Sequence, residues 1–193
     1  MEESEGTWVQ QARIGDQGAF GRLVEVYQTP VYNLAYRLLG NSTEAEDASQ
    51  ETFIRAYTRL STYDPERRFS SWLLAITSHY CVDMLRRRRV TSLSLDDLPP
   101  MLELAMPSVA QPEHAVIHRQ DASAVQQLLN ALPQSYRTPV ILRYWYDMSY
   151  QEIADTMGVT ESTIKTRLHR ARAMMAGLAH GTGLPICEGE IDE

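Results

Sequence analysis

The stretch SYQEIADTMGVTESTIKTRLHRAR, from Ser149 to Arg172, decides the fold of this chain. Ser149 and Glu152 have the S-x-x-E spacing of a capping box, in which two side chains accept hydrogen bonds from backbone amides at a helix start. Gly158 lies where that helix needs a left-handed final residue, and Thr160 can cap a following helix. The stretch therefore predicts two short helices joined by a tight turn.

The two predicted helices carry small and apolar residues on the faces that would meet. Ile153, Ala154 and Met157 share one face of the first helix, and Ile164 and Leu168 share one face of the second. Helices that cross steeply need such residues where they touch, which is typical of a helix-turn-helix motif.

The outer face of the second predicted helix is basic, with Glu161 as its single acidic residue. A basic outer face at this place suits the major groove of DNA. An ordinary helical hairpin with a solvated face would look similar, but cap, turn, packing residues and charge together favour DNA binding. The outward positions are Thr163, Lys165, Thr166, Arg167, Arg170 and Arg172.

Composition bounds the fold class. The chain has 193 residues, of which 44% are hydrophobic, so it can form one globular domain or two small ones. Strand-like alternation does not persist, and we expect an all-α fold. No apolar run is long enough to cross a membrane, and no signal peptide is evident, so we expect no membrane insertion. Two lone cysteines, Cys81 and Cys187, fit a reducing compartment.

The net charge of −7 argues at first against a DNA partner, but its distribution matters more than its sum. Acidic residues gather near both termini and between Glu44 and Glu51. Basic residues gather in Arg86–Arg89 and in the second helix of the predicted motif. Two separated basic patches suggest two DNA contacts.

The N-terminal part reads as a series of helices. Asp16 can cap a helix whose apolar residues run to Tyr27, and Pro30 then opens a separate helix that ends at Gly40-Asn41.

Thr43 and Glu46 form a second capping box and start a helix with an acidic outer face, which is either merely solvated or docks on a basic helical partner. We expect Ala45, Ala48, Thr52, Ala56, Tyr57 and either Phe53 or Ile54 to face inward.

A further helix is expected from Phe69 to Leu85, capped by Ser70 or Ser71 and running into Arg86–Arg89. Basic residues at a helix end complement its dipole, yet four in succession exceed that need. Trp72, His79 and Tyr80 lie upstream on the same helix. Aromatic side chains beside a cationic cluster can hold single-stranded nucleic acid.

Residues 92–112 contain four prolines and form a predicted linker, whose apolar residues suggest that part of it occupies a groove of a partner. Helices resume from Glu113 to Asn130 and from Leu132-Pro133 to Tyr146, and residues 181–193 form an acidic tail. His114 and His118 are four residues apart, but no third ligand is evident, so we expect no metal ion and no cofactor.

In this order the pieces resemble the bacterial sigma-70 family, specifically its small extracytoplasmic-function group. The resemblance is carried by GDQGAF (Gly15–Phe20), AEDASQETFIRAY (Ala45–Tyr57), FSSWLLAI (Phe69–Ile76), Asp83–Arg89 and the long stretch Leu132–Arg172.

The resemblance implies roles for particular residues. The acidic helix corresponds to the surface that docks on core RNA polymerase, with candidate contacts Asp47, Gln50, Glu51 and Phe53. The next helix corresponds to the element that recognises and opens the −10 promoter element, with candidates Trp72, His79, Tyr80, Arg86, Arg87, Arg88 and Arg89. The basic helix corresponds to the −35 reader. The family often has Asn where this chain has His79, which leaves the preferred −10 bases open.

The implied organisation is a sigma-2-like domain in residues 1–91, a linker in 92–112, a sigma-4-like domain in 113–180 and a flexible tail in 181–193. The implied partners are the clamp and flap regions of core polymerase, promoter DNA and an anti-sigma factor. The protein would act in the cytoplasm on the nucleoid, or be tethered indirectly to a membrane through the anti-sigma factor.

Two other functions would account for less of the sequence. A stand-alone helix-turn-helix regulator would leave the acidic helix and the arginine run without a role. A helical enzyme would need a convergent set of carboxylates or of His and Cys residues, which the sequence lacks.

Overall fold

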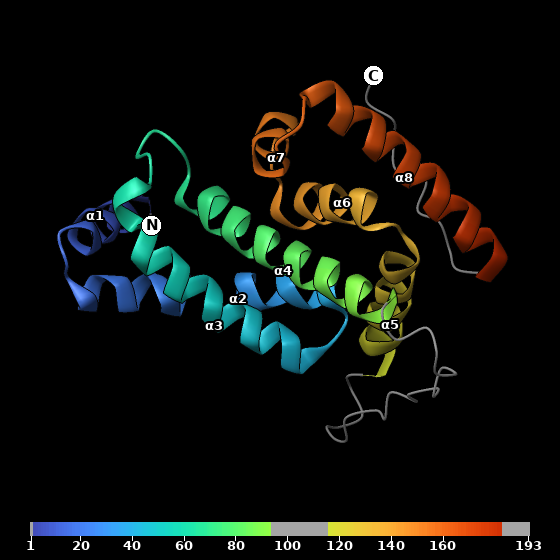
Figure 1. Cartoon of the computed structure of the whole chain (residues 1–193), viewed down its shortest axis with the longest axis horizontal. Coiled ribbons are helices and arrows are strands. Elements are labelled where there is room, and N and C mark those ends of the chain that lie inside the picture. The colour runs from blue at the N-terminus through green and yellow to red at the C-terminus, as the bar shows by residue number, and fades with distance from the viewer. Residues whose placement is uncertain (1, 94–115, 183–193) are drawn as a thin grey trace.

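The computed structural model describes residues 2–93 and 116–182, and every element in these two ranges is helical (Figure 1). The elements are α1 (Glu2–Arg13), α2 (Gln17–Leu39), α3 (Ser42–Arg59), the 3-10 turn η1 (Leu60–Thr62), α4 (Phe69–Leu93), α5 (Val116–Ala131), α6 (Gln134–Tyr146), α7 (Tyr150–Met157) and α8 (Glu161–Thr182). The expected all-α class is confirmed. None of the described helices combines the length and the hydropathy that crossing a membrane requires.

Helices α1 to α4 pack around one apolar cluster at the N-terminal end of the molecule. Helix α1, which was not predicted from the sequence, contributes Val9 and Ala12 to this cluster. The hydroxyl of Tyr27 also donates to Glu5 of α1 at 2.8 Å. The first residues of α1 are acidic and offer no capping pattern, so the sequence gave little indication of a helix here. The helix is stabilised mainly by packing against its neighbours.

Pro30 lies inside α2 and does not open a separate helix, so the sequence prediction of two helices is wrong here. The buried residues Tyr27, Val31, Leu34 and Leu38 recur at helical spacing on both sides of the proline. A proline removes one backbone hydrogen bond, but this continuous apolar face packs against the rest of the protein. Packing therefore outweighs the local cost.

Helix α3 begins earlier than predicted. Its N-cap is Asn41, whose side-chain oxygen accepts from the amide of Glu44 at 3.0 Å, rather than Thr43. Ala45, Ala48, Thr52 and Ala56 are buried as expected. Ile54 and Tyr57 are not, with exposed fractions of 59% and 41%, whereas Phe53 packs partly against the core. The inward stripe is narrow because small residues let α3 approach its neighbours closely.

The helix-turn-helix prediction is confirmed in detail. Ser149 and Glu152 form both hydrogen bonds of the capping box at the start of α7. Gly158 ends α7 with φ +63°, a conformation that costs little only without a Cβ. Ile164 and Leu168 of α8 are buried against Ile153 and Ala154 of α7.

The two halves of the chain share a core. One apolar cluster joins Leu34 and Leu38 of α2 and Leu74 of α4 to residues of α5 to α8. Figure 1 shows α6 and α7 lying over α4, with α5 at its C-terminal end. Polar contacts reinforce this arrangement, since the hydroxyl of Tyr146 donates to the carbonyl of Pro30 at 2.7 Å.

Candidate nucleic-acid and protein interfaces

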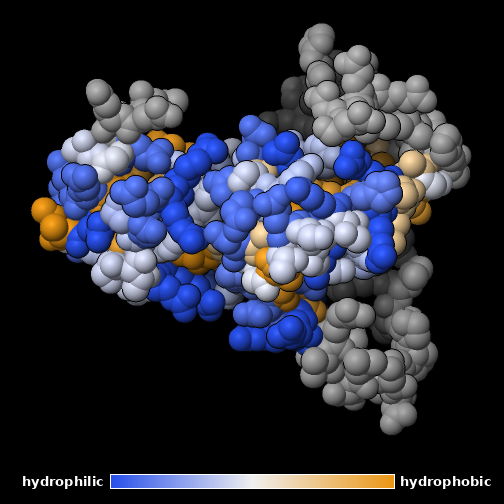
Figure 2. Space-filling view, turned by 90° about the horizontal axis from the view of Figure 1, so that it is seen from above, coloured by the Kyte–Doolittle hydropathy of each residue, from blue (hydrophilic) through white to orange (hydrophobic). Residues whose placement is uncertain are grey.

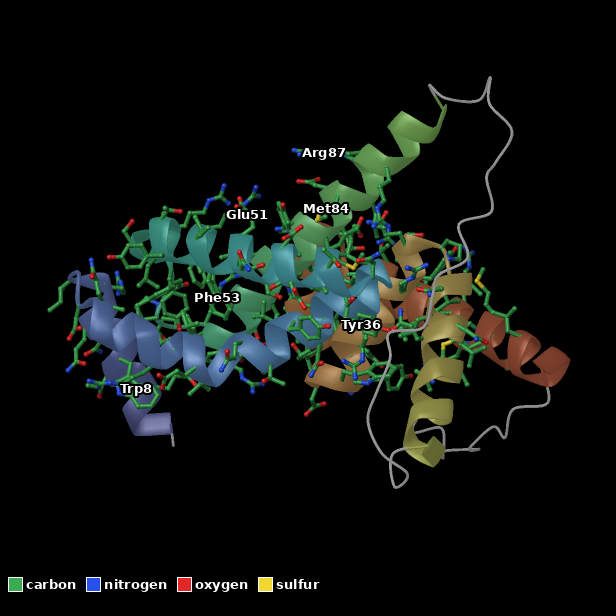
Figure 3. All side chains as sticks on the ribbon, turned by 90° about the horizontal axis from the view of Figure 1, so that it is seen from below. Trp8, Tyr36, Glu51, Phe53, Met84 and Arg87 are labelled. Carbon is green, nitrogen blue, oxygen red and sulfur yellow. The ribbon has the colours of Figure 1, made fainter. Side chains whose placement is uncertain are left out.

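The acidic side of α3 forms the first candidate surface. Asp47 and Gln50 are exposed, and Glu51 is half-buried and accepts a hydrogen bond from Arg55 at 2.7 Å. Glu51 lies on the outer side of α3, and Phe53 lies between α3 and α2 (Figure 3). A groove runs beside them and is lined by Val24, Gln28, Thr29, Tyr32, Ser49, Gln50 and Phe53. Acidic groups at the edge of a partly apolar groove suit an amphipathic, basic partner.

The aromatic residues of α4 are already engaged within the protein. Trp72 is half-buried and packs at 5.6 Å from Phe69 and 5.3 Å from Tyr63, measured between ring centroids. The guanidinium of Arg55 lies 4.6 Å from the ring centroid of Tyr80. The positions of these two rings are therefore set by aromatic packing and by a cation–π contact within the protein.

The arginine run continues α4 as a helix. Arg86, Arg87 and Arg88 are exposed, and the side chain of Arg89 lies outside the described residues. Arg88 forms an ion pair with Glu44 at the start of α3. Arg87 extends from the C-terminal half of α4 towards solvent (Figure 3). The run thus reaches beyond the packed body of the protein at one end of α4.

The predicted outer face of α8 divides into two sides. Four of its residues share one polar groove, which is lined by Tyr136, Ser162, Thr163, Thr166, Arg167 and Arg170. Lys165 and Arg172 do not line it. Lys165 instead pairs with Glu161 at 2.8 Å and lies near the ring of Tyr150.

The face of the molecule seen from above is mostly hydrophilic, with apolar residues visible in small separate areas (Figure 2).

A third surface was not predicted from the sequence, namely the contact between α4 with its preceding loop and α7. We call it the α4–α7 junction and define it by Arg67, Ser71 and His79 on one side and Glu152, Asp155 and Thr156 on the other. Ser71 donates to Glu152 at 2.5 Å, and the ring nitrogen Nε2 of His79 contacts the carbonyl oxygen of Thr156.

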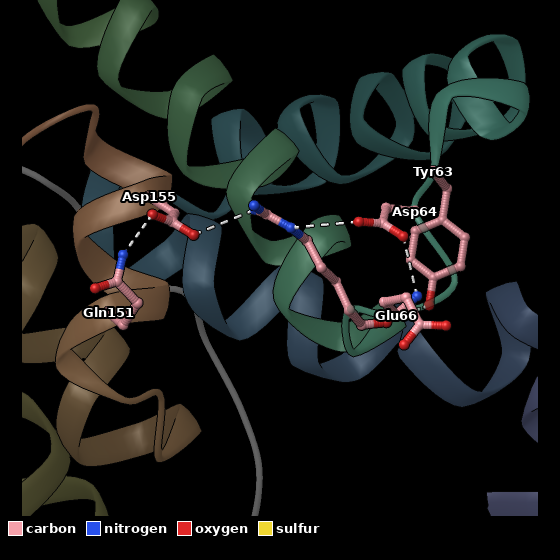
Figure 4. A network of polar contacts seen from close by, with 6 residues as sticks. Tyr63, Asp64, Glu66, Gln151 and Asp155 are labelled. Carbon is pink, nitrogen blue, oxygen red and sulfur yellow. Dashed lines mark hydrogen bonds and ion pairs between the residues drawn. The ribbon is translucent and has the colours of Figure 1, made fainter.

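Figure 4 shows the edge of this junction, where an arginine reaches from the loop before α4 to α7. Arg67 lies 3.3 Å from Asp155 and 3.8 Å from Asp64. Gln151 donates to the same Asp155 at 2.8 Å. The sequence offered no signal for this network. Either Ser70 or Ser71 was expected to cap α4, and Ser71 instead donates across the junction.

Glu152 holds two roles at once. Burial alone would raise the pKa of its carboxyl, but hydrogen bonds from Ser71 and Ser149 and the charge of Arg68 together hold that pKa below its ordinary value. One oxygen accepts from the backbone amide of Ser149 at 2.8 Å and the other from Ser71. The carboxylate thus caps α7 and joins it to α4.

This lowered pKa predicts a pH dependence. A carboxyl whose pKa is lower in the folded state stabilises that state above its unfolded pKa of about 4.3, and the contribution is lost as pH falls through the folded pKa. In urea titrations we expect the stability difference between the wild type and Glu152→Gln to be constant above about pH 5.5 and to shrink in more acidic buffer. A difference that stays the same down to pH 3 would contradict this role.

Models of known protein families match both halves of the chain. The model "Sigma-70 region 2" matches residues 23–91, and the model "Sigma-70, region 4" matches residues 122–175. The ECF RNA polymerase sigma factor SigW of Bacillus subtilis (strain 168) is 37% identical over 169 residues, which cover 85% of this chain and 90% of that protein. The chain belongs to the extracytoplasmic-function sigma factors.

Solved structures agree with this family. CnrH, solved in complex with the cytosolic domain of CnrY, is 25% identical to this sigma factor with a TM-score of 0.69, covering 92% of this chain and 98% of CnrH. The sigma factor RpoE of Bartonella quintana, solved with the anti-sigma factor NepR, has 22% identity and a TM-score of 0.67, covering 83% and 96% of the two chains. The second likeness supports the fold of this sigma factor.

Proposed function

We propose that this sigma factor binds core RNA polymerase and directs initiation at promoters by contacting a −35 and a −10 element. The observation that carries the proposal is its 37% identity to SigW over nearly the whole of both chains. In this proposal residues 1–91 bind polymerase and the −10 element, residues 113–180 bind the −35 element, and 92–112 link them. The protein is then a specificity subunit rather than an enzyme, and it works in the cytoplasm where polymerase and DNA are found.

For the −35 element we propose the polar groove of α8 as the DNA-facing side. Arg167 lies in this groove together with Thr163 and Arg170, so a base-edge contact by Arg167 and a phosphate contact by Arg170 are compatible in one orientation. Lys165 lies in the same half of α8 as Arg167 and is an alternative base reader. Its pairing with Glu161 and its place beside Tyr150 favour Arg167 as the base reader.

For the −10 element we propose that His79 captures a base while the exposed arginines at the end of α4 neutralise phosphates. Arg86, Arg87 and Arg88 are exposed near the C-terminal end of α4, where Arg88 also pairs with Glu44, and exposed cations suit the phosphates of a single strand. Trp72 and Tyr80 shape the surface around His79 through their packing within the protein.

For core polymerase we propose a basic, amphipathic helical partner on the outer side of α3. Exposed Asp47 and Gln50 lie beside the groove that Phe53 lines, so charge and apolar contact can act together. An anti-sigma factor would inhibit most simply by covering the same groove. CnrH, which is 25% identical to this chain, was solved with a bound protein, the cytosolic domain of CnrY, and this supports a protein partner for this chain.

The testing experiment is transcription in vitro with purified core polymerase on a library of genomic promoter fragments. We expect transcripts with defined start sites only when this protein is added. A stand-alone regulator would give no such transcripts and would not co-purify with core polymerase in a one-to-one ratio.

The same assay tests the −35 assignment. Replacing Arg167 by alanine is expected to reduce discrimination at one −35 base pair by about 1–3 kcal/mol, which is roughly 5- to 150-fold. Replacing Arg170 by alanine serves as the matched control and is expected to weaken all promoters about equally. Uniform weakening by Arg167→Ala would show that Arg167 is a phosphate contact instead.

A further inference from the structure

The polar groove of α8 has one wall that α8 does not supply. Tyr136 lies in the first turn of α6, and α6 packs against α8 (Figure 1). The other residues that line the groove, among them Thr163, Arg167 and Arg170, all belong to α8. Tyr136 was not among the residues that the sequence predicted to meet DNA, because a single tyrosine at a helix start carries no charge pattern.

Tyr136 is held in place while its hydroxyl stays available. The residue is half-buried and packs against the apolar cluster that both halves of the chain share. Its backbone amide donates to the carbonyl of Pro133 at 2.9 Å, within the first turn of α6. Its hydroxyl forms no hydrogen bond with any residue that the structure describes. A tyrosine hydroxyl usually finds a partner, and the groove is the place where Tyr136 is open to one.

The charges around the groove suit an anion. Arg167 is half-buried and Arg170 is exposed, and neither forms an ion pair within the described part of the chain. None of the residues that line the groove is acidic. Glu161, in the first turn of α8, pairs with Lys165 at 2.8 Å outside the groove. In addition, α6 begins without a side-chain cap or an acidic residue in its first turn, so the positive end of its dipole is not compensated there.

We propose that Tyr136 donates a hydrogen bond to a phosphate of the −35 duplex and so fixes the orientation of α8 in the major groove. This role rests on the proposed function, in which the groove is the DNA-facing side of α8. Tyr136 is then a positioning residue, because phosphate contacts set register and orientation without reading the sequence. A strand held by Tyr136 of α6 and by Arg170 of α8 is held from two helices, which limits the base edges that Arg167 can reach.

The affinity of the full chain for duplex DNA tests this role. Two duplexes are used, one with the −35 region of a promoter that is active in the transcription assay and one of mixed sequence. Tyr136→Phe keeps the ring and removes the hydroxyl, and it is expected to weaken binding to both duplexes by the same factor, about three- to tenfold. Its urea midpoint should equal that of the wild type, because the hydroxyl has no partner among the described residues.

Tyr144→Phe is the matched control. It is the same change in the same helix, at a position that is 57% exposed and does not line the groove. We expect this variant to bind both duplexes as the wild type does. A loss in Tyr144→Phe as large as that in Tyr136→Phe would contradict the special place of Tyr136.

Salt dependence separates a neutral donor from a cation. A hydroxyl releases no counterion, so Tyr136→Phe should keep the slope of log Kd against log salt concentration. Arg170→Ala is expected to reduce that slope by about one. A changed slope in Tyr136→Phe, a loss confined to one base pair, or binding equal to that of the wild type would overturn the role of Tyr136.

The two arms also separate this role from the function on which it rests. If Arg170→Ala weakens binding to the mixed-sequence duplex and Tyr136→Phe does not, only the role of Tyr136 fails. If neither variant changes affinity or slope, the groove is not the DNA-facing side, and the proposed −35 surface fails with it.

Neutral methylphosphonate groups locate the phosphate on the −35 duplex. Each replaces one charged phosphate oxygen by a methyl group at a chosen position. At the phosphate that Tyr136 binds, the wild type is expected to lose about three- to tenfold more affinity than Tyr136→Phe, because the variant has already lost the contact. At other positions the two proteins should lose the same. Equal losses at every position would show that Tyr136 does not contact the DNA backbone.

Discussion

Replacing Ile164 by alanine is expected to lower the free energy of unfolding by about 2–5 kcal/mol. Ile164 is fully buried at the point where α8 crosses α7, and it belongs to the apolar cluster shared by both halves. The loss combines the transfer of buried methyl and methylene groups to water with the cavity left behind. The change is measured as a shift of the urea midpoint at constant slope.

Ile54 provides the matched control, because it is the same residue type in the middle of a helix but has 59% of its surface exposed. Ile54→Ala is expected to change stability by less than about 0.5 kcal/mol. Equal effects of the two substitutions would mean that α7 and α8 do not form the packed motif described above. A strong effect at Ile164 alone would show that the helix-turn-helix unit is stabilised by the buried contact where α8 crosses α7.

Replacing Arg137 by methionine is expected to cost about 2–4 kcal/mol, because three carbonyl groups lose their donor. Its guanidinium donates to the carbonyls of Leu38 at 2.9 Å, Asn130 at 2.7 Å and Leu132 at 3.2 Å. These carbonyls lie at the C-terminal ends of α2 and α5, where backbone acceptors have no partner within the helix. Burial lowers the pKa of Arg137, which reflects how far this charge is removed from water.

The contribution of Arg137 to stability should depend on the planar arrangement of donors in its guanidinium group rather than on its charge. Arg137→Lys keeps the charge but cannot reach three carbonyls at once, so it is expected to recover only part of the loss. Arg59→Met, at an exposed position in the last turn of α3, is the control and should be nearly neutral. If lysine restores full stability, the charge alone matters and the geometric account is wrong.

Local chemistry made several elements predictable. The capping box of Ser149 and Glu152, the left-handed turn at Gly158 and the inward spacing of Ile164 and Leu168 involve residues close in sequence, and all of them appear as expected. Where two local signals compete, the sequence does not decide between them. Asn41 caps α3 although Thr43 offered a better pattern, and Pro30 sits within α2 although proline usually begins a helix.

The binding surfaces could be foreseen as lists of residues, but not as arrangements. Helical spacing does not tell how α8 is oriented, so Lys165 and Arg167 were grouped although they lie on different sides of the helix. Likewise, the sequence names Trp72 and Tyr80 as candidates but does not show that Phe69, Tyr63 and Arg55 contact their rings. Which side of a polar face remains open depends on neighbours from distant parts of the chain.

By itself the sequence determined that this chain is helical, that it carries a helix-turn-helix unit and that its basic residues form two groups. These properties follow from caps, turns and periodicity, which act over a few residues. Only the tertiary structure decided that α7 packs on α4 and that Glu152 accepts a hydrogen bond from Ser71. The same is true of the hydrogen bonds from Arg137 and Tyr146 to carbonyls of α2. Such contacts join residues about 80 to 120 positions apart, and their formation depends on the burial of a shared apolar core, which no local pattern can specify.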